Sequence, residues 1–293
     1  MSRENPNLAW QSKLVLLLVL PFAGANVFLA AEGWRTQLPA IATWTLGLSL
    51  LLGLITWRLR AATPAAAATG ATITASLMFS TVIYPYAPER TALIPVLGVS
   101  LLAFAATRIG RRKKERLGTA EARRGRNAHQ IAANLGFAAL IALPPAESWL
   151  LNRPWPARIS LAPALLFAPM LAALAEAAAD TVSSEIGQVF GGKPRMITTL
   201  RAAEPGRDGA ISVAGTLAGV LGAAAIAGIG AAALRGDRYL FVVSGTGAVF
   251  GLFFDSLLGA TLEEWGWLNN DLVNFLSTAS AAAFALFLLA VLR

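Results

Sequence analysis

The chain has 293 residues, of which 56% are hydrophobic and only 14% are charged, and its mean hydropathy is +0.60. A soluble domain carries about 25% charged residues, so this composition excludes an ordinary soluble protein and indicates a polytopic helical membrane protein. The lack of cysteine excludes disulfides and thiolate chemistry, and a single histidine excludes a multi-histidine metal site. Cytoplasmic loops and anionic lipid headgroups account for the net charge of +8, so no nucleic-acid partner is expected.

Apolar runs of nearly membrane-spanning length recur along the chain, and one span needs roughly 20 residues. They predict about nine transmembrane helices, at 14–31, 38–57, 64–86, 91–107, 128–144, 159–183, 213–234, 239–259 and 271–292. The first run is interpreted as a helix and not as a signal peptide, because it lacks a clear cleavage site and more spans follow. We therefore expect an all-α fold in a single membrane domain, 1–293. Its parts are N-terminal spans (1–107), a basic loop (108–127) and a core that carries the motif loops (128–293).

The orientation of these spans is predicted from the lysines and arginines. Most of the 24 fall in inside segments if the N-terminus is inside, and the segment IGRRKKERLG (109–118) contributes most. An odd number of spans then leaves the C-terminus outside. We expect an integral protein of a bacterial inner membrane, with the polar motifs on the cytoplasmic side.

The stretch GQVFGGKP, from Gly187 to Pro194, reads G-x-x-x-x-G-K, as a phosphate-binding P-loop begins. A Walker loop needs a preceding strand and a Ser or Thr for Mg²⁺, whereas this chain has a helix-forming segment before the motif and Pro194 after the lysine. The Walker interpretation is therefore rejected. Gly191 and Gly192 still let backbone amides approach an anion, and Lys193 and Arg195 add positive charge, so a phosphate site of another design stays open.

Carboxylates in or beside predicted spans are candidates for function, because a charge near the bilayer centre costs about 2.5–3.5 kcal/mol on insertion scales. They are Glu176, Asp180, Glu185, Asp255 and Asp271. Glu176 and Asp180 are four residues apart and share a helical face. The alternative is that such residues lie at the interface and cap helices, which is a serious alternative for Asp271 after Asn269 and Asn270.

Two glycine pairs have G-x-x-x-G spacing: Gly215 with Gly219, and Gly247 with Gly251. Close packing of helices is favoured over a role in ligand binding.

Longer phrases carry a family resemblance. ADTVSSEIG (179–187), GGKPRMITTLRAAEPGRDGAISVAGTLAG (191–219), FDSLLGATLE (254–263) and LNNDLVNFL (268–276) resemble the integral membrane family called domain of unknown function 92. ATRIGRRKKERLG (106–118) and the Gln130–Asn134 region fit it too, so the resemblance covers roughly 100 to 293. The plant and cyanobacterial members of that family include the phytyl-phosphate kinase of vitamin E synthesis. A more distant similarity, to CTP-dependent polyprenol kinases and phosphatidate cytidylyltransferases, follows the order Asp180, Gly187, Gly191–Lys193 and Gly215–Thr216.

The resemblance implies transfer of the γ-phosphoryl group of a nucleotide, expected to be CTP, to an isoprenoid monophosphate of phytyl or geranylgeranyl type. Such a reaction mainly needs positioning and charge neutralisation, with Mg²⁺ as cofactor. The implied metal-binding residues are Asp180 with Asp255 or Asp271, together with Glu176 and Glu185. Asp180, Lys193, Arg195 and Arg207 form the implied catalytic set, in which the three basic residues hold phosphates. Further nucleotide or phosphate contacts are assigned to Gly191, Gly192, Gly206, Gly209, Ser212, Thr216, Asn270 and Asn274.

The chain departs from the family pattern at two positions. Glu263 stands where Gln is frequent, which weakens any role given to it, and Ala210 replaces a common second glycine while Gly209 remains.

Other functions remain open from the sequence. A lipid alcohol kinase or a cytidylyltransferase would use the same broad chemistry, and a transporter of an anionic lipid or small anion would also use intramembrane carboxylates. Transport is disfavoured because the polar motifs gather on one predicted side. A function in packing or assembly alone does not explain the polar loop 191–212.

Overall fold

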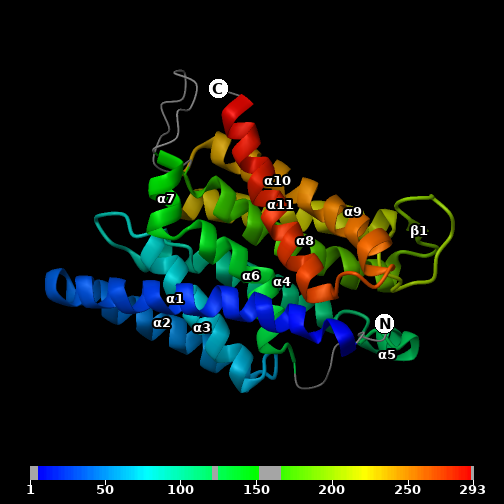
Figure 1. Cartoon of the computed structure of the whole chain (residues 1–293), viewed down its shortest axis with the longest axis horizontal. Coiled ribbons are helices and arrows are strands. Elements are labelled where there is room, and N and C mark those ends of the chain that lie inside the picture. The colour runs from blue at the N-terminus through cyan, green and yellow to red at the C-terminus, as the bar shows by residue number, and fades with distance from the viewer. Residues whose placement is uncertain (1–5, 121–124, 152–165, 292–293) are drawn as a thin grey trace.

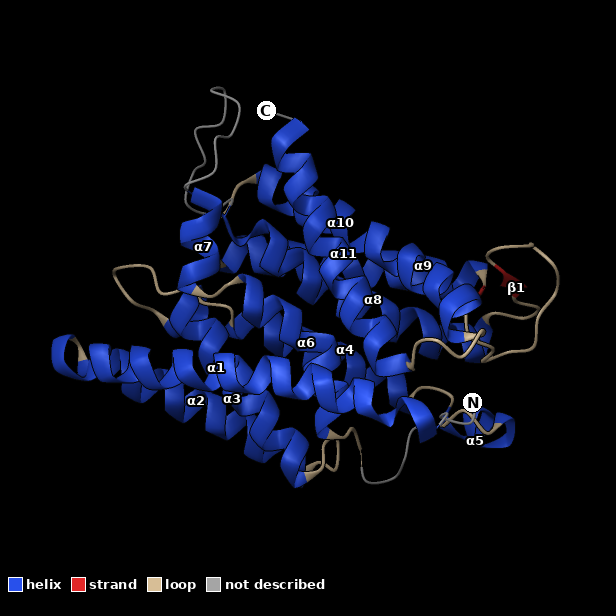
Figure 2. Ribbon diagram, in the orientation of Figure 1, coloured by secondary structure: helices blue, strands red, loops and turns tan. Residues whose placement is uncertain are grey.

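The computed structural model describes residues 6–120, 125–151 and 166–291, and helices dominate these ranges (Figures 1 and 2). The helices are α1 (Ala9–Gln37), α2 (Pro39–Arg58), α3 (Pro64–Ser80), α4 (Leu93–Arg108), α5 (Arg111–Leu117), α6 (Ala128–Ile141), α7 (Pro144–Leu151), α8 (Ala168–Phe190), α9 (Val213–Ala233), α10 (Arg238–Leu258) and α11 (Asn270–Val291). A π-helical turn, η4 (Gly259–Glu263), extends α10, and short 3-10 turns lie at Pro6–Leu8 (η1) and Pro88–Arg90 (η2). The strands β1 (Arg195–Met196) and β2 (Ala210–Ile211) form a small antiparallel hairpin.

The all-α prediction is confirmed, and each of the nine predicted spans contains a helix. Residues 159–165 of the sixth predicted span and residue 292 of the last lie outside the described residues. Five helices in the described part are long and apolar enough to cross a membrane, namely α1, α2, α9, α10 with η4, and α11. A sixth span results if α4 and α5, which are bent by 67° relative to each other, are counted together. The count of about nine is therefore not confirmed, and neither is the membrane orientation of the termini.

The difference arises from helices that the protein itself covers. Helices α3 and α6 have 17 and 14 residues, which is short for a span, and much of each is buried. Helix α8 is the centre of the bundle and packs against α4, α6, α9, α10 and α11. Every residue from Ala168 to Ala179 is buried. The first half of α8 is alanine-rich and covered by protein, so its apolar composition resembles that of a lipid-facing span although it contains Glu176.

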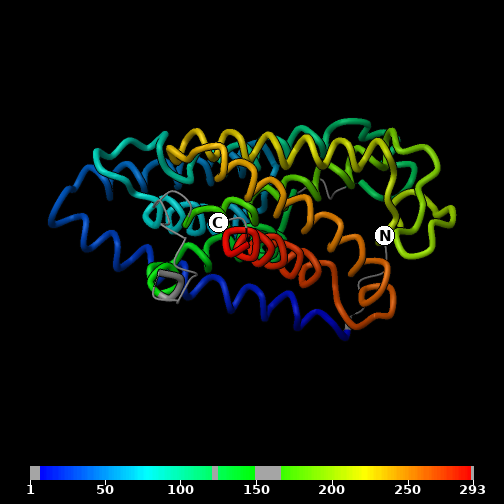
Figure 3. Tube along the Cα trace, turned by 90° about the horizontal axis from the view of Figure 1, so that it is seen from above, coloured from blue at the N-terminus to red at the C-terminus, as the bar shows by residue number. Residues whose placement is uncertain are grey.

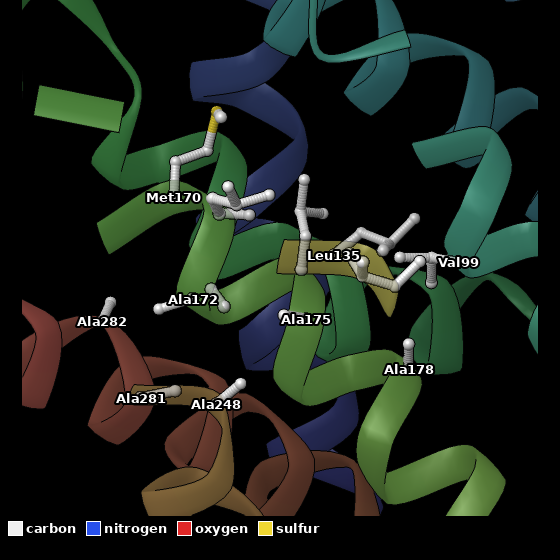
Figure 4. Close-up of a cluster of buried hydrophobic side chains, with 14 of the residues drawn as sticks. Val99, Leu135, Met170, Ala172, Ala175, Ala178, Ala248, Ala281 and Ala282 are labelled. Carbon is white, nitrogen blue, oxygen red and sulfur yellow. The ribbon is translucent and has the colours of Figure 1, made fainter. Parts of the chain in front are cut away.

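Small side chains let neighbouring helices approach α8 closely. Figure 4 shows Ala172, Ala175 and Ala178 of α8 facing side chains of the surrounding helices, including Leu135 of α6 and Ala248 of α10. These residues belong to one continuous apolar core that extends through most of the bundle.

The two G-x-x-x-G pairs pack as predicted. A Cβ atom on Gly215 would lie 2.7 Å from the Ser183 carbonyl oxygen, and one on Gly219 would lie 3.0 Å from the Ala179 carbonyl oxygen. These glycines therefore allow α9 to pack closely on α8. A Cβ atom on Gly247 would lie 2.7 Å from the Ala281 carbonyl oxygen, so this pair seats α10 on α11. A larger residue at these positions would separate the helices.

The polar segments gather at one end of the bundle. The start of α1, helix α5 and the β1–β2 hairpin lie together there, and the C-terminal end of α11 lies far from them (Figures 1 and 3). Gln11 ties the start of α1 to the segment before α11, because its Nε2 donates to the Trp267 carbonyl oxygen at 2.8 Å and its Oε1 accepts from the Asn269 N–H at 2.8 Å. The basic segment meets the end of α8 just before Gly191, because Lys113 Nζ donates to the Val189 carbonyl oxygen at 2.6 Å across 76 residues of sequence.

Candidate active site

Carboxylates from four elements, namely α8, α10, η4 and α11, converge near this end of the bundle. Glu176 and Asp180 lie one turn apart on α8, and Asp255 lies in the last turn of α10. Asp255 interacts electrostatically with Asp180, Glu176 and Glu263. Glu263, which ends η4, interacts electrostatically with Asp180 and Asp271 as well. The structure therefore brings together Glu176, Asp180, Asp255 and Asp271. Glu185 also interacts electrostatically with Asp180, although Lys114 pairs with it. Glu263 joins the group, although the family pattern weakens any role given to it.

Two oxygens of this carboxylate cluster (Glu176, Asp180, Asp255, Glu263 and Asp271) lack hydrogen-bond partners among the described residues. They are Glu176 Oε1 and Asp255 Oδ2, both buried. Ser277 of α11 lies beside both carboxylates, but its hydroxyl donates to the Asn274 carbonyl oxygen at 2.9 Å. Buried carboxylate oxygens without donors are costly, and they fit a site that a cation completes.

Arg126 supplies positive charge next to the cluster. Its Nη2 donates to the Thr181 hydroxyl at 3.2 Å, and its guanidinium interacts electrostatically with Asp180. Arg126 lies in the predicted basic loop and has no predicted site role, because a pairing across 54 residues leaves no trace in a single sequence.

Two carboxylates of the cluster could serve as ligands of a divalent cation whose other ligands come from outside the chain. Within the described ranges, no group of three or more His, Cys, Asp or Glu side chains is arranged to hold a metal by itself. Mg²⁺ in nucleotide sites typically uses one or two carboxylates, with substrate phosphates and water completing its coordination. Asp180 and Asp255 suit this role, because they come from different helices and lie within electrostatic range of each other.

The G-x-x-x-x-G-K motif lies at the C-terminal end of a helix. Helix α8 continues through Phe190, and the Gly191 N–H still donates to the Gly187 carbonyl oxygen at 2.8 Å. A P-loop instead presents the N-terminal end of a helix, which carries partial positive charge. The rejection of a Walker loop is therefore confirmed. A Cβ atom on Gly191 would lie 2.4 Å from Ser212 Oγ, so this glycine mainly allows the end of α8 to meet the start of α9.

The loop 191–212 is fixed against the carboxylate cluster at Gly209. This glycine has a φ of +72°, and a Cβ atom there would lie 2.3 Å from the Ala260 backbone nitrogen in η4. At the other side of the loop, Gly206 has a φ of +86° and lies against Thr119, at the end of the basic segment. Both glycines allow contacts and backbone conformations that a side chain would hinder.

The three basic residues that the sequence selects in this loop have different surroundings. Lys193 is exposed. Arg195 Nη1 donates to the Leu200 carbonyl oxygen at 2.7 Å and so stabilises the hairpin itself. Arg207 forms an exposed ion pair with Glu264. Their predicted contacts with phosphates remain a prediction.

Some polar residues at the starts of α9 and α11 cap these helices, and others do not. Ser212 caps α9 by accepting from the Gly215 N–H at 3.1 Å, and Thr216 follows in the first turn. Asn269 caps α11 by accepting from the Leu272 N–H at 2.9 Å. Asp271 is buried and is not needed as the cap, whereas Asn270 is exposed and Asn274 is half-buried one turn later.

Glu185 is occupied by a partner that the sequence did not indicate. Lys114 of α5 is 1% exposed, pairs with Glu185, and donates to the carbonyl oxygens of Ala106 at 3.0 Å and Thr107 at 2.9 Å. Its neighbour Lys113 donates to the Val189 carbonyl oxygen at 2.6 Å, near the negative end of the α8 dipole. The basic segment is thus fastened to α8.

The fold and site define a polytopic helical membrane protein with a buried acidic cluster and a glycine-rich polar loop at one end. The chain belongs to the family described as integral membrane protein DUF92, whose model matches residues 47–282. No solved structure matches the chain.

Three relatives were found among curated proteins. "Uncharacterized membrane protein sll0875" of Synechocystis is 34% identical over 197 residues, which are 65% of this chain and 71% of the relative. "Uncharacterized membrane protein MJ0933" of Methanocaldococcus jannaschii is 45% identical over 108 residues, 37% of this chain and 45% of the relative. "Protein VTE6, chloroplastic" of Arabidopsis thaliana is 33% identical over 113 residues, 36% of this chain and 33% of the relative. The chain therefore covers less than half of the latter two relatives.

Proposed function

We propose that the protein is an isoprenoid-monophosphate kinase. It transfers the γ-phosphoryl group of a nucleotide, expected to be CTP, to a phytyl- or geranylgeranyl-type monophosphate. An oxygen of the lipid phosphate forms a bond to the γ-phosphorus, the bond between that phosphorus and the β–γ bridging oxygen breaks, and the products are the lipid diphosphate and the nucleoside diphosphate. The resemblance to phytyl-phosphate kinase described above and the match to a plant relative support this assignment.

The observation that carries the proposal is the buried carboxylate cluster with its unsatisfied oxygens. Glu176 Oε1 and Asp255 Oδ2 have no donor in the described part of the chain, and Arg126 is the cation beside Asp180. A cluster with excess negative charge inside a membrane protein indicates a functional site, because hydrophobic residues would pack there at a lower cost in folding free energy.

The acceptor phosphate is already anionic near neutral pH, so the reaction requires no strong general base. The protein must place two anionic groups in line and neutralise their charge. In this proposal Arg126 orients the acceptor phosphate beside Asp180, and the loop 191–212 offers Lys193 and backbone N–H groups to the nucleotide phosphates. We propose that this end of the bundle faces the cytoplasm, where nucleotides are present.

Mg²⁺ would be held by Asp180 and Asp255, with Glu176 and Asp271 nearby. When bound, it would neutralise charge on the nucleotide phosphates. Glu185 contributes less to this set, because Lys114 already engages it.

The test is turnover by protein reconstituted in lipid nanodiscs. Geranylgeranyl monophosphate, Mg²⁺ and each nucleoside triphosphate are supplied in turn, and the product is identified by mass. Asp180→Asn keeps the size of the side chain, so we expect folded protein with a loss of turnover of at least a hundredfold. The control is Asp237→Asn. Asp237 caps the start of α10, at the end of that helix opposite to Asp255. Full activity of Asp180→Asn would remove the carboxylate cluster from the mechanism.

A further inference from the structure

A cavity of about 390 Å³ lies between α2, α3, α4, α6 and α8. Much of its wall is apolar, with Leu52 of α2, Ala67 of α3, Val99 and Ala103 of α4, and Leu135 of α6, and the polar residues Thr74, Ser100 and Asn134 also line it. Helix α2 packs mainly against α1 and α3, whereas α4 packs mainly against α8 and α9. The cavity therefore separates two packing groups of helices and is of the size that protein pockets use for small ligands.

One end of the cavity is rich in arginine. Arg60, Arg108, Arg111 and Arg126 line it, together with a single carboxylate, Glu115. Glu115 pairs with Arg111 at 3.1 Å, and Arg126 interacts electrostatically with Asp180, so the positive charge of Arg60 and Arg108 exceeds the carboxylate charge in the lining. An arginine-lined end on an apolar cavity matches a ligand with a phosphate head and a hydrocarbon tail.

The arginine-lined end is held in shape by the backbone. The Arg126 N–H donates to the Ala61 carbonyl oxygen at 3.0 Å, and the Thr63 N–H donates to the Arg126 carbonyl oxygen at 3.0 Å. Gly125 has a φ of +76°, and a Cβ atom there would lie 2.3 Å from the Ala61 carbonyl carbon. Arg60 itself has a φ of +54°, which is unusual for a residue with a side chain.

Two of the arginines also have fixed side chains. The Arg108 guanidinium lies 3.4 Å from the centre of the Phe104 ring, and its Nη2 donates to the Leu59 carbonyl oxygen at 3.2 Å. Arg126 is positioned by its hydrogen bond to Thr181. An arginine end that is ordered by the protein itself loses little entropy when an anion binds.

Arg126 joins this cavity to the carboxylate cluster. It lines the cavity and also interacts with Asp180. Ala177 of α8 lines the cavity too, and the neighbouring residue in sequence, Glu176, belongs to the carboxylate cluster. A phosphate bound at the arginine end would therefore be separated from the carboxylate cluster only by α8 and Arg126.

We propose that this cavity is the site of the acceptor lipid, a single-chain isoprenoid monophosphate. Its phosphate binds Arg60, Arg108 and Arg126, and its tail lies between α2, α3 and α4. This assignment rests on the proposed kinase function for its substrate class, but binding at the cavity can be measured without turnover.

The test uses geranylgeranyl monophosphate with a photoreactive diazirine in its tail. The full chain in nanodiscs is irradiated without nucleotide, and the labelled peptides are mapped by mass spectrometry. We expect labels on α2, α3 and α4. Competition with unlabelled geranylgeranyl monophosphate should remove them, whereas inorganic phosphate and geranylgeraniol, which carry only the head or the tail chemistry, should compete at least tenfold less well.

Two variants and one control define the site. Arg60→Gln combined with Arg108→Gln should lower labelling tenfold or more, since each removes charge-assisted hydrogen bonds to phosphate. Ala103→Leu should lower it by filling the apolar part of the cavity, and it leaves every arginine in place. Arg112→Gln is the matched control, because Arg112 is an exposed residue of α5 that does not line the cavity. It should label as the unaltered protein does.

The outcomes separate this proposal from the kinase function. Labelling confined to α9–α11, or unaffected by both variants, overturns the cavity assignment even if the protein turns over. Labelling of the cavity in a protein without kinase activity supports the lipid site and contradicts the proposed reaction alone.

Discussion

Lys114 is expected to fasten the basic segment to the centre of the bundle, and Lys114→Met tests this directly. The methionine keeps a long apolar side chain in a position that is 1% exposed, but it removes the ammonium. It leaves the Glu185 carboxylate, which is 13% exposed, without its partner, and it deprives the Ala106 and Thr107 carbonyl oxygens of a donor.

The magnitude follows from the burial of the pair. Removing one member of a buried ion pair costs about 3–5 kcal/mol of stability. Because Glu185 is partly solvated, we expect the free energy of unfolding to fall by about 3 kcal/mol. Lys113→Met is the matched control, since Lys113 is exposed and makes a single hydrogen bond to the Val189 carbonyl oxygen, so about 1 kcal/mol is expected. Combining Lys114→Met with Glu185→Met removes both charges and should restore most of the loss.

Two assays measure this effect. Unfolding in mixed detergent micelles, followed by circular dichroism, gives the loss of global stability. Limited trypsin digestion reports whether the segment around α5 detaches locally, which the global assay can miss. Lys114 does not fasten this segment if Lys114→Met is as stable and as protected as Lys113→Met, or if the double variant is less stable than Lys114→Met alone.

Three further substitutions test the packing around the site. Gly209→Ala should release the loop 191–212 from η4, because the new Cβ would lie 2.3 Å from the Ala260 nitrogen and the residue has a φ of +72°. We expect faster proteolysis of that loop, and an unchanged rate of cleavage would contradict the prediction. Asn269→Ala should cost about 1 kcal/mol or more in detergent unfolding, through loss of the α11 cap and of its ties to the start of α1, whereas an unchanged midpoint would show that the cap is dispensable. Gly251→Val should lower stability by about 1–3 kcal/mol and impair turnover, since a Cβ there would lie 2.6 Å from Glu176 Cγ; a stable, fully active variant would argue against the tight seating of Glu176.

The helices could largely be located from the sequence. Predictions at 213–234 and 239–259 agree with α9 and α10 within a residue, because apolar runs there begin after the capping residues Ser212 and Asp237. The predicted span 64–86 extends beyond α3, which ends at Ser80. Apolar composition reports the burial of a segment, but it does not distinguish burial in lipid from burial in protein, so the number of spans could not be obtained from it.

The candidate site was predictable only in part. The helical spacing of Glu176 and Asp180 is visible in the sequence, and the glycine-rich phrase points to the loop that packs on η4. The contacts of Arg126 with Thr181 and of Lys114 with Glu185 join segments more than 50 residues apart. Such pairings depend on how α6 and α5 pack against α8, and no local pattern encodes them.

Transfer of the γ-phosphoryl group to a lipid monophosphate can be followed with labelled CTP. Reconstituted protein is given geranylgeranyl monophosphate, Mg²⁺ and CTP that carries its label at either the α- or the γ-phosphorus. The kinase function predicts that the γ-label alone enters the lipid fraction, as a diphosphate of matching mass. Entry of the α-label would identify a cytidylyltransferase instead. Entry of neither label into the lipid, with CTP or any other nucleoside triphosphate, would contradict the proposed function.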